Sequence, residues 1–440
     1  MAGKKRRQKV RVAHELPKGR KKEIKQALES HEDERSEWDR SNDWGDIRVE
    51  RKLVRKGELR TIEMPLLNQN LGDSWPITIT IIHGNRPGPR IAVLGGMHGD
   101  ELTGPSACTN LLSSSFTDPD EELDPSQVSG TIFIIPVLNL PGYRSKSRYM
   151  PDGRDLNREF PGRSKGSTTS RVAHKLWNNI LKDMDYIIDL HCAARGRNNM
   201  PQVRADLAHV PSNRIAKAFG IEVIVDSKPP RGSLRKVALA NDIGVITYEG
   251  GGANWLDHIS VKIAVYGVLN ILKSLHIIPG VAHRPRFRLL ASGSTWIRAS
   301  EGGLLDMFVS AGSVVESGDT IARISDPGTP GLSIDIISPD DGIMLCAATN
   351  PFVTAGAPVG HLLPVSKHIN LLKSQVDDTG QLVVCGSKDE PPWREDEEVD
   401  EIQLKGEWSG GNVDAEWQSI ASGEEGFNDD ATPSMEEEAA

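Results

Sequence analysis

The sequence predicts an α/β fold: a mainly parallel or mixed sheet with helices on both faces, followed by a small all-β domain. Between residues 48 and 278, short apolar runs alternate with helix-compatible segments, which is the pattern of a mainly parallel sheet. Several runs are apolar at successive positions, as in strands that are buried on both faces. After a proline-containing link at 279–285, residues 286–365 hold many short β-forming segments with Gly and Pro-Asp turns and almost no helix pattern, which indicates a sandwich or barrel.

The expected elements follow this alternation along the chain. Residues 47–82 are rich in alternating β-formers, and a short helix is expected within 21–36. The amphipathic pattern is strongest in the last helix before the proline-containing link. We expect strands at 77–82, 90–96, 131–138, 186–190, 221–225 and 245–248, and helices at 104–113, 171–181 and 260–274.

The distribution of charge divides the chain further. The formal net charge is -9, but the N-terminal segment is rich in Lys and Arg, and the segment after residue 377 is acidic. Long blocks of like charge bury too little apolar surface to offset the entropy of ordering. We therefore expect disordered tails at 1–45 and 377–440, an α/β domain at 46–280 and an all-β domain at 286–366.

Cysteine usage and hydropathy place the protein in a broad class. Its 4 cysteines are scattered, without a Cys-x-x-Cys pair, which argues against a disulfide framework and against a cysteine-rich zinc module. No apolar run follows the basic N-terminus, and no uncharged stretch reaches the roughly 20 residues that span a bilayer. We expect a cytoplasmic protein with no membrane partner.

Histidine and glutamate residues fall where the expected strands end. His98 and Glu101 follow an apolar run, and their i, i+3 spacing at the start of a helix would bring them to one face. His191 and Glu249 each directly follow a further expected strand. Ligands bind beyond the carboxyl ends of parallel strands, so we expect the four side chains at one edge of the sheet. Two His and one Glu leave an open zinc position for water, as in catalytic sites, and a second carboxylate can take a proton from that water.

Each part of this pattern also has a purely structural interpretation. A His-x-x-Glu pair occurs often by chance. His191 alone fits a hydrogen-bonded core histidine, and Glu249, before three glycines, fits a capping or turn carboxylate. The coincidence of all four residues at strand ends favours the metal site.

An arginine-rich loop is expected at the same edge. Arg148, Arg154, Asn157 and Arg158 all lie between residues 148 and 162. Guanidinium groups bind carboxylates through paired, charge-assisted hydrogen bonds, so this loop suits an anionic substrate. A solvated surface loop with scattered ion pairs fits the spacing equally well.

Four short motifs together resemble a known family. They are HGDE at 98–101, DLNR at 155–158, DLH at 189–191 and YEGG at 248–251. Over about residues 75–365, their order, spacing and flanking strands resemble the succinylglutamate desuccinylase/aspartoacylase family of the zinc carboxypeptidase-like superfamily. The resemblance implies a zinc carboxypeptidase-like fold, with a zinc hydrolase domain at 46–280 that removes the acyl group from a small N-acyl amino acid.

The resemblance implies a role for each matching residue of the metal site. His98, Glu101 and His191 would hold one Zn²⁺ per chain, although other divalent metals such as cobalt or manganese also suit these ligands. Glu249 would be the general base. Arg148 would polarise the scissile carbonyl and stabilise the oxyanion, a kind of electrostatic assistance that is large in acyl transfer.

The resemblance extends to the substrate's carboxylate groups. Asn157 and Arg158 match the pair that binds the α-carboxylate. Arg235 is a candidate for a second carboxylate contact, and so is Arg204. The acyl group and the amino acid are both left open.

The β-rich region at 286–366 resembles a biotinyl/lipoyl-like hammerhead. Carrier domains of this kind attach their cofactor to a lysine at an exposed hairpin, and the corresponding hairpin at 337–343 has no lysine. We therefore expect no covalent cofactor. A lid or an oligomerisation surface is the expected role, which is compatible with a homo-oligomer.

Two other functions remain to be weighed. A zinc carboxypeptidase acting on peptides would use the same metal ligands and carboxylate contacts, but a β-rich lid favours small substrates. A non-catalytic protein could bind nucleic acid through residues 1–25. The acidic overall balance and the lack of aromatic residues in that tail argue against nucleic acid, and all four metal and base residues are present.

Overall fold

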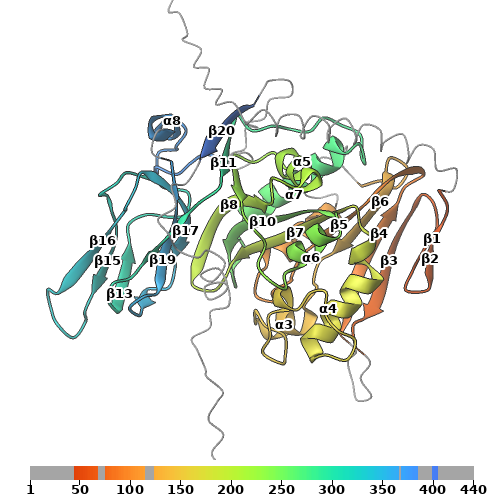
Figure 1. Ribbon diagram of the computed structural model, residues 1–440, viewed down its shortest axis with the longest axis horizontal. Helices are drawn as coiled ribbons and strands as arrows, with labels where there is room; N and C mark the ends of the chain where they lie inside the picture. The colour runs from red at the N-terminus through yellow and green to blue at the C-terminus, as the bar shows by residue number, and fades with distance from the viewer. Residues whose placement is uncertain (1–43, 68–74, 114–122, 366–367, 385–398, 405–440) are drawn as a thin grey trace, which may run out of the picture. The chain divides into compact units, whose positions relative to one another are not determined.

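The computed structural model describes residues 44–67, 75–113, 123–365, 368–384 and 399–404. The helix expected within 21–36, and all of the expected N-terminal tail except its last two residues, lie outside the described residues. The main sheet has 14 strands, of which ten follow the order β12-β19-β17-β8-β10-β7-β5-β6-β4-β3 (Figure 1). Within the described part of the chain, no helix is long and apolar enough to cross a membrane.

The centre of the main sheet is parallel, and the strands directly beside it are antiparallel. The parallel strands are β6 (Ser129–Ile135), β5 (Arg86–Leu94), β7 (Tyr186–Ala193) and β10 (Gly244–Gly252). The antiparallel strands beside them are β4 (Pro76–His83) and β3 (Glu58–Pro65) at one side and β8 (Arg197–Ala205) at the other. The mainly parallel or mixed sheet that the sequence predicts is confirmed, and a separate hairpin joins β1 (Ile47–Val49) to β2 (Lys52–Val54).

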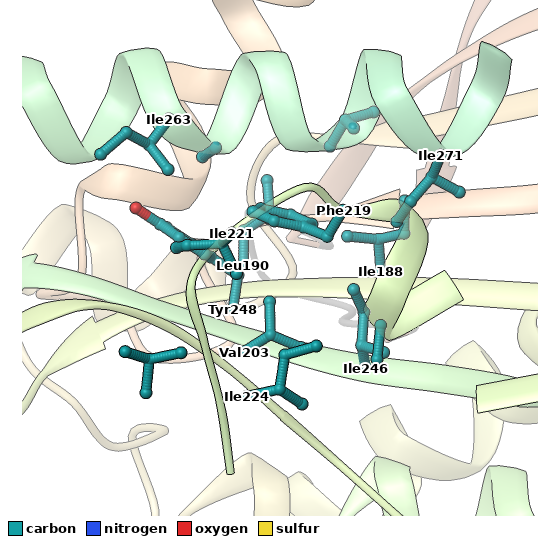
Figure 2. Close-up of a cluster of buried hydrophobic side chains, with 14 of the residues drawn as sticks. Ile188, Leu190, Val203, Phe219, Ile221, Ile224, Ile246, Tyr248, Ile263 and Ile271 are labelled. Atoms are coloured by element: carbon teal, nitrogen blue, oxygen red, sulfur yellow. The ribbon is translucent and has the colours of Figure 1, made fainter. Parts of the chain in front are cut away.

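Side chains of the central strands alternate between two apolar cores. In β5, Ile91 and Val93 join one core, whereas Ala92 and Leu94 join the other, because successive side chains of a strand point to opposite faces. Figure 2 shows the first core, where Tyr248 stacks on Phe219 at 5.2 Å between ring centroids. Both faces of the sheet are therefore apolar and must be covered by helices.

Helices cover both faces, as predicted. The first core packs against α2 (Thr103–Leu111), α5 (Val210–Ala218) and α7 (His258–Ser274), and the second against α4 (Thr168–Asn179) and α6 (Leu234–Ala240). The side chains of Ser167, Ser233 and Asp257 accept backbone hydrogen bonds at the starts of α4, α6 and α7, which satisfies N–H groups that a helix leaves unpaired. The sequence pattern did not indicate α5 and α6, which are short. The other short helices among the described residues are α3 (Leu140–Ser145), η2 (Leu156–Arg158), η3 (Leu181–Asp183) and α8 (Ile369–Lys373).

Strand β8 was not predicted, because its sequence RNNMPQVRA is polar and contains Pro201. One edge of β8 pairs first with β17 (Gly342–Ala348), through residues 197–199, and then with β9 (Val223–Asp226), through residues 203–205. Pro201 lies between the two paired segments, at a place where that edge needs no backbone donor. The sheet therefore forks at β8.

One branch of the fork carries the β-rich region. Residues 286–365 contain strands and no helix, as predicted, and their first sheet continues β8 rather than standing apart from it. The strands in this branch are β17, β19 (Pro358–Pro364), β12 (Thr295–Arg298) and β14 (Val314–Val315). A separate sheet has the order β16-β15-β13-β18, with β13 (Gly303–Met307), β15 (Thr320–Ser325), β16 (Ser333–Ile337) and β18 (Phe352–Val353).

The other branch ends in a strand that corrects an expectation. β9 pairs with β11 (Phe287–Ala291), and β11 pairs with β20 (Asp400–Leu404). Residues 400–404 lie within the segment 377–440 that we expected to be a disordered acidic tail. An ion pair of 2.9 Å joins Glu401 Oε1 to Arg288 Nη1, so the acidic character that suggested disorder here helps to hold an edge strand.

A stacked aromatic pair joins β12 to β19. Trp296 and His361 are cross-strand partners, and their rings stack with centroids 4.3 Å apart and an interplanar angle of 5°. Burial, with smaller contributions from Arg204 and Arg197, lowers the pKa of His361 to about 3. The imidazole is therefore neutral at every ordinary pH.

We expect His361 to make folding sensitive to acid. Its pKa is about 3 in the folded chain and 6.5 as the ordinary value, so between these values the unfolded chain binds the extra proton, and the free energy of unfolding falls as pH decreases below 6.5. Between pH 6.5 and pH 5 this loss amounts to about 2 kcal/mol.

The measurement is urea unfolding of the wild type and of His361→Phe at pH 8, 6.5 and 5. The difference between the two proteins at pH 8 gives the effect of the substitution on packing alone. Between pH 6.5 and pH 5, the free energy of unfolding should fall by about 2 kcal/mol less in the variant than in the wild type. Parallel losses in the two proteins would contradict the lowered pKa.

Candidate active site

His98 and Glu101 lie in the turn between β5 and α2, and not in a helix as their spacing suggested. α2 begins at Thr103, and a hydrogen bond of 3.3 Å from Glu101 N to His98 O closes the turn before it. Gly99 lets this turn approach α3, because a Cβ at that position would lie 1.9 Å from the backbone carbon of Gly142. The turn is therefore held by close backbone packing.

The structure brings His98, Glu101 and His191 together as a buried cluster whose potential ligand atoms lie within 4.8 Å of one another. His98 Nδ1 is 2.7 Å from Glu101 Oε1, and His191 Nδ1 is 2.9 Å from Glu101 Oε2. The backbone N–H of Cys192 also donates to Glu101 Oε2, at 3.2 Å. Both Nδ1 atoms thus face the same carboxylate.

A second carboxylate stands behind each imidazole. His98 Nε2 is 3.1 Å from Asp155 Oδ1, and His191 Nε2 is 2.9 Å from Asp189 Oδ2. Carboxylates in this position fix the orientation of metal-binding histidines and increase their basicity. Both aspartates belong to the motifs found in the sequence, where they had no assigned role.

This arrangement fits a divalent metal ion. His98 Nδ1 is close to Glu101 but makes no hydrogen bond to it, as expected of two atoms that aim at a common ion. Burial alone would raise the pKa of Glu101, but His98 and His191 hold it well below its usual value. Burial alone would lower the pKa of His191, whereas Asp189 and Glu101 hold it well above its usual value. A bound cation can replace these imidazolium charges, because histidine binds metals in its neutral form.

Glu249 lies beside this cluster because of the register between β10 and β7. Glu249 pairs directly with His191 across the two strands, and a bulge follows Glu249 in the pairing of β10 with both neighbours. Tyr248 points into the core under α7 (Figure 2), so Glu249 points to the other face. Its carboxylate accepts a hydrogen bond of 3.0 Å from Asn199 Nδ2 and lies 3.5 Å from Arg204 Nη1.

Arg148 is bound to the metal-site carboxylates. Its Nη1 donates to Glu101 Oε1 at 2.9 Å, and its Nη2 donates to Asp155 Oδ2 at 3.1 Å. Burial lowers the pKa of Arg148, but Asp155 and Glu101 more than compensate and hold it above the usual value. Arg148 is therefore a fixed cation at the cluster.

The candidate carboxylate-binding residues lie at one end of the same cavity. Asn157 Oδ1 accepts a hydrogen bond of 2.9 Å from Leu234 N, at the start of α6, which leaves the amide nitrogen for other contacts. Arg158 Nη1 donates to the backbone oxygen of Asn157 at 2.9 Å. Arg154, also noted in this loop, instead pairs with Glu159 at 3.2 Å and is more than half exposed.

Arg235 is a buried cation that faces the cavity. Its Nη2 donates to Ser227 Oγ at 3.1 Å, and its Nη1 has no partner among the described groups. Burial and the nearby Arg204 lower its pKa to about 10. An anion close to this buried guanidinium would stabilise its charge, which makes Arg235 and Arg204 a candidate subsite for negative charge.

A single cavity of about 910 Å³, including space open to solvent, collects these residues. All eight residues expected from the motifs line it, and so does Arg204. Other lining residues were not indicated by any motif, because β8 and β12 showed no functional pattern and Lys228 lies in a loop; they include Arg197, Asn199, Lys228 and Trp296.

A known family model matches the central part of this chain. The model of the succinylglutamate desuccinylase/aspartoacylase catalytic domain matches residues 87–275. Residues 87–275 are therefore similar to this catalytic domain. The resemblance inferred from the four motifs is thereby confirmed.

Relatives of this family cover most of the chain. The N-alpha-acetyl-L-2,4-diaminobutyric acid deacetylase of Halomonas elongata is 27% identical over 308 residues, which are 64% of this chain and 84% of the relative. A succinylglutamate desuccinylase/aspartoacylase structure from Rhodobacter sphaeroides matches with a TM-score of 0.62 and 26% identity, over 72% of this chain and 97% of that one. The product-bound ectoine utilization protein EutE (DoeB) of Ruegeria pomeroyi shares the fold, with a TM-score of 0.63 and 23% identity over 73% and 99% of the two chains.

We expect Asp189→Asn to weaken Zn²⁺ binding by about 10- to 100-fold, because the amide cannot supply the negative charge that supports His191. The measurement is competition for Zn²⁺ with a chromophoric chelator.

The matched control is Asp242→Asn. Asp242 Oδ1 lies 2.9 Å from His209 Nε2 in an Asp–His pair outside the cavity. Equal Zn²⁺ affinities for the wild type and both variants would contradict a supporting role for Asp189.

Proposed function

We propose that this protein is a zinc-dependent deacylase, which hydrolyses the amide bond of a small N-acyl amino acid. The observation that carries the proposal is the cavity that joins the buried His98–Glu101–His191 cluster to Glu249 and to a set of arginines. The named relatives, a deacetylase and a desuccinylase/aspartoacylase, support this reaction class.

The three cluster residues would hold one Zn²⁺ per chain. Two imidazoles and one carboxylate leave a coordination position open, and a zinc ion bound in this way acidifies water and polarises a carbonyl. Asp155 and Asp189 keep both imidazoles in the orientation that presents Nδ1.

Glu249 is the proposed general base. It takes a proton from the attacking water, and the water oxygen then bonds to the acyl carbon. Glu249 passes this proton to the leaving nitrogen as the carbon–nitrogen bond breaks, which releases a carboxylate and a free amine. Asn199 and Arg204 restrain its carboxylate on β10, which supports a fixed position for both proton transfers.

Arg148 is the proposed stabiliser of the negative charge that develops on the acyl oxygen. Its two terminal nitrogens are occupied by Glu101 and Asp155. If Glu101 held the ion, its contact with Arg148 would weaken, and the Arg148 Nη1 group would be available to the substrate oxygen. A preorganised cation in a buried site is an effective stabiliser of such charge.

The cations of the cavity support a substrate with at least one carboxylate. We propose that Asn157 and Arg158 bind the α-carboxylate, as the family resemblance implies, and that Arg235 binds a polar or acidic side chain. An ammonium side chain, as in the substrate named for the Halomonas relative, would lie near Arg204, Arg235 and Lys228. A neutral or acidic side chain therefore suits this chain better.

We expect Glu249→Gln to keep about one Zn²⁺ per chain and to lose about 100- to 10,000-fold in kcat, because the amide cannot accept the proton from water. Metal content is measured by mass spectrometry, and hydrolysis is measured on a panel of N-acyl amino acids, dipeptides and longer peptides. The peptides distinguish a deacylase from a carboxypeptidase.

Two comparisons complete this test. Glu316→Gln replaces a glutamate outside the cavity and should leave both zinc and turnover unchanged. His98→Ala should lose both. Wild-type turnover in Glu249→Gln would refute the general base, and a wild type that neither binds zinc nor hydrolyses any amide would refute the proposed function.

We expect Arg235→Gln to reduce kcat/KM for N-acetyl-aspartate or N-acetyl-glutamate by about 10- to 100-fold, mainly through KM, since a hydrogen bond to a charged group contributes about 1.5–3 kcal/mol. N-acetyl-alanine, which has no side-chain carboxylate, should be affected much less. An equal loss for both kinds of substrate would show that Arg235 acts on the scaffold and not on the side chain.

A further inference from the structure

One wall of the cavity comes from the β-rich region. Trp296, on β12, lines the cavity together with Ala193 and Ala194 near the end of β7 and Arg197 on β8. Trp296 is far from the other three in the sequence, and it meets them because β17 pairs with β8, β19 with β17 and β12 with β19. No motif in the sequence indicated a function for Trp296.

The register of β8 against β10 places this wall relative to Glu249. Arg204 pairs with Thr247, before Glu249 on β10, whereas Asn199 pairs with Gly251, after Glu249. The subsite for negative charge at Arg204 and Arg235 thus begins on one side of Glu249. The wall next to Arg197 begins on the other side. Under the proposed function, on which this inference rests, the scissile carbonyl lies near Glu249. If the amino acid extends toward Arg235, the acyl chain extends toward the wall.

The indole of Trp296 is held by stacking. Its ring lies parallel to that of His361, 4.3 Å away, and the guanidinium carbon of Arg197 lies 5.6 Å from the indole centroid. The indole nitrogen is buried and has no hydrogen-bond partner among the described groups. His361 is 1% exposed, so the indole packs against a side chain that is itself enclosed by its neighbours.

We propose that Trp296 is a specificity-determining residue that limits the length of the acyl group. An indole is large and rigid, so a longer acyl chain cannot share its space without displacing it from His361. Each additional methylene that has no room costs such a site about a factor of ten or more. His361 is the positioning residue behind the indole.

The first test measures acyl-length preference. kcat/KM is determined for N-acetyl, N-butyryl and N-hexanoyl derivatives of one amino acid, with the zinc-loaded wild type, Trp296→Phe and Trp296→Ala. The ratio of hexanoyl to acetyl turnover should rise at least tenfold in Trp296→Ala and by a smaller factor in Trp296→Phe. The control is Phe352→Ala, since Phe352 is an aromatic residue of the same region that is 59% exposed and does not line the cavity. An unchanged ratio in Trp296→Ala would overturn the proposal.

The second test does not depend on turnover. Acetate, butyrate and hexanoate are the carboxylate products of the same series, and their binding to each zinc-loaded protein is measured by calorimetry. Hexanoate should gain at least tenfold in affinity relative to acetate in Trp296→Ala, and equal relative affinities would overturn the proposal. If the wild type hydrolysed no N-acyl amino acid, the proposed function would fail. The binding of acetate, butyrate and hexanoate would still decide whether Trp296 limits the length of chain that the cavity accepts.

Variants of His361 test whether this residue acts by supporting the indole of Trp296 or whether any change in packing has the same effect. His361→Phe keeps an aromatic ring behind the indole and should keep the wild-type preference. His361→Ala removes the support and should shift the ratio in the same direction as Trp296→Ala. Circular dichroism and zinc content identify any variant that has failed to fold, in which case Trp296→Phe carries the test. A shift in His361→Phe as large as that in His361→Ala would contradict the positioning role.

Discussion

The buried carboxylate of Glu101 connects three segments of the chain that carry the site. Its two oxygens contact the side chains of His98, His191 and Arg148 and the backbone N–H of Cys192. A buried charge is costly unless it is paired and hydrogen-bonded, so each of these partners must be in place for the others to be stable. The turn before α2, the end of β7 and the loop that contains Arg148 are therefore fixed relative to one another by one ionised group, which is also the central ligand of the proposed metal site.

The two-sided burial of the sheet explains why the other functional groups face the same cavity. Leu190 and Tyr248 point into the core beneath α7, and the residues that follow them, His191 and Glu249, must point to the opposite face. The register of β10 against β7 then places these two residues side by side. A shift of one residue in either strand would turn the functional side chain into the apolar core. The stability of the core and the geometry of the site thus depend on the same alternation.

The fork at β8 determines how the cavity is enclosed. The strand places Asn199 and Arg204 against Glu249 and also pairs with both branches of the sheet. One branch extends to β12 and brings Trp296 to the cavity, and the other, at the end of β9, brings Ser227, which contacts Arg235. The two branches therefore border the cavity at different places, one through Trp296 and the other through Ser227 next to Arg235.

The sequence by itself determined the alternating strands and helices, the four candidate metal and base residues and the arginine loop, because apolar periodicity and short motifs are local properties of the chain. It placed His98 and Glu101 at the start of a helix rather than in the turn before it. It did not indicate β8, whose polar sequence is stabilised by partners on both edges, nor β20, whose Glu401 pairs with the distant cations Lys217 and Arg288. Only the tertiary structure decided that Asp155 and Asp189 support the histidines, that Asn199 and Arg204 restrain Glu249, and that Trp296 lines the cavity. Apart from the local Asp189–His191 pair, these contacts join residues separated by about 45 to 100 positions, and they arise from strand order and register, which no local pattern encodes.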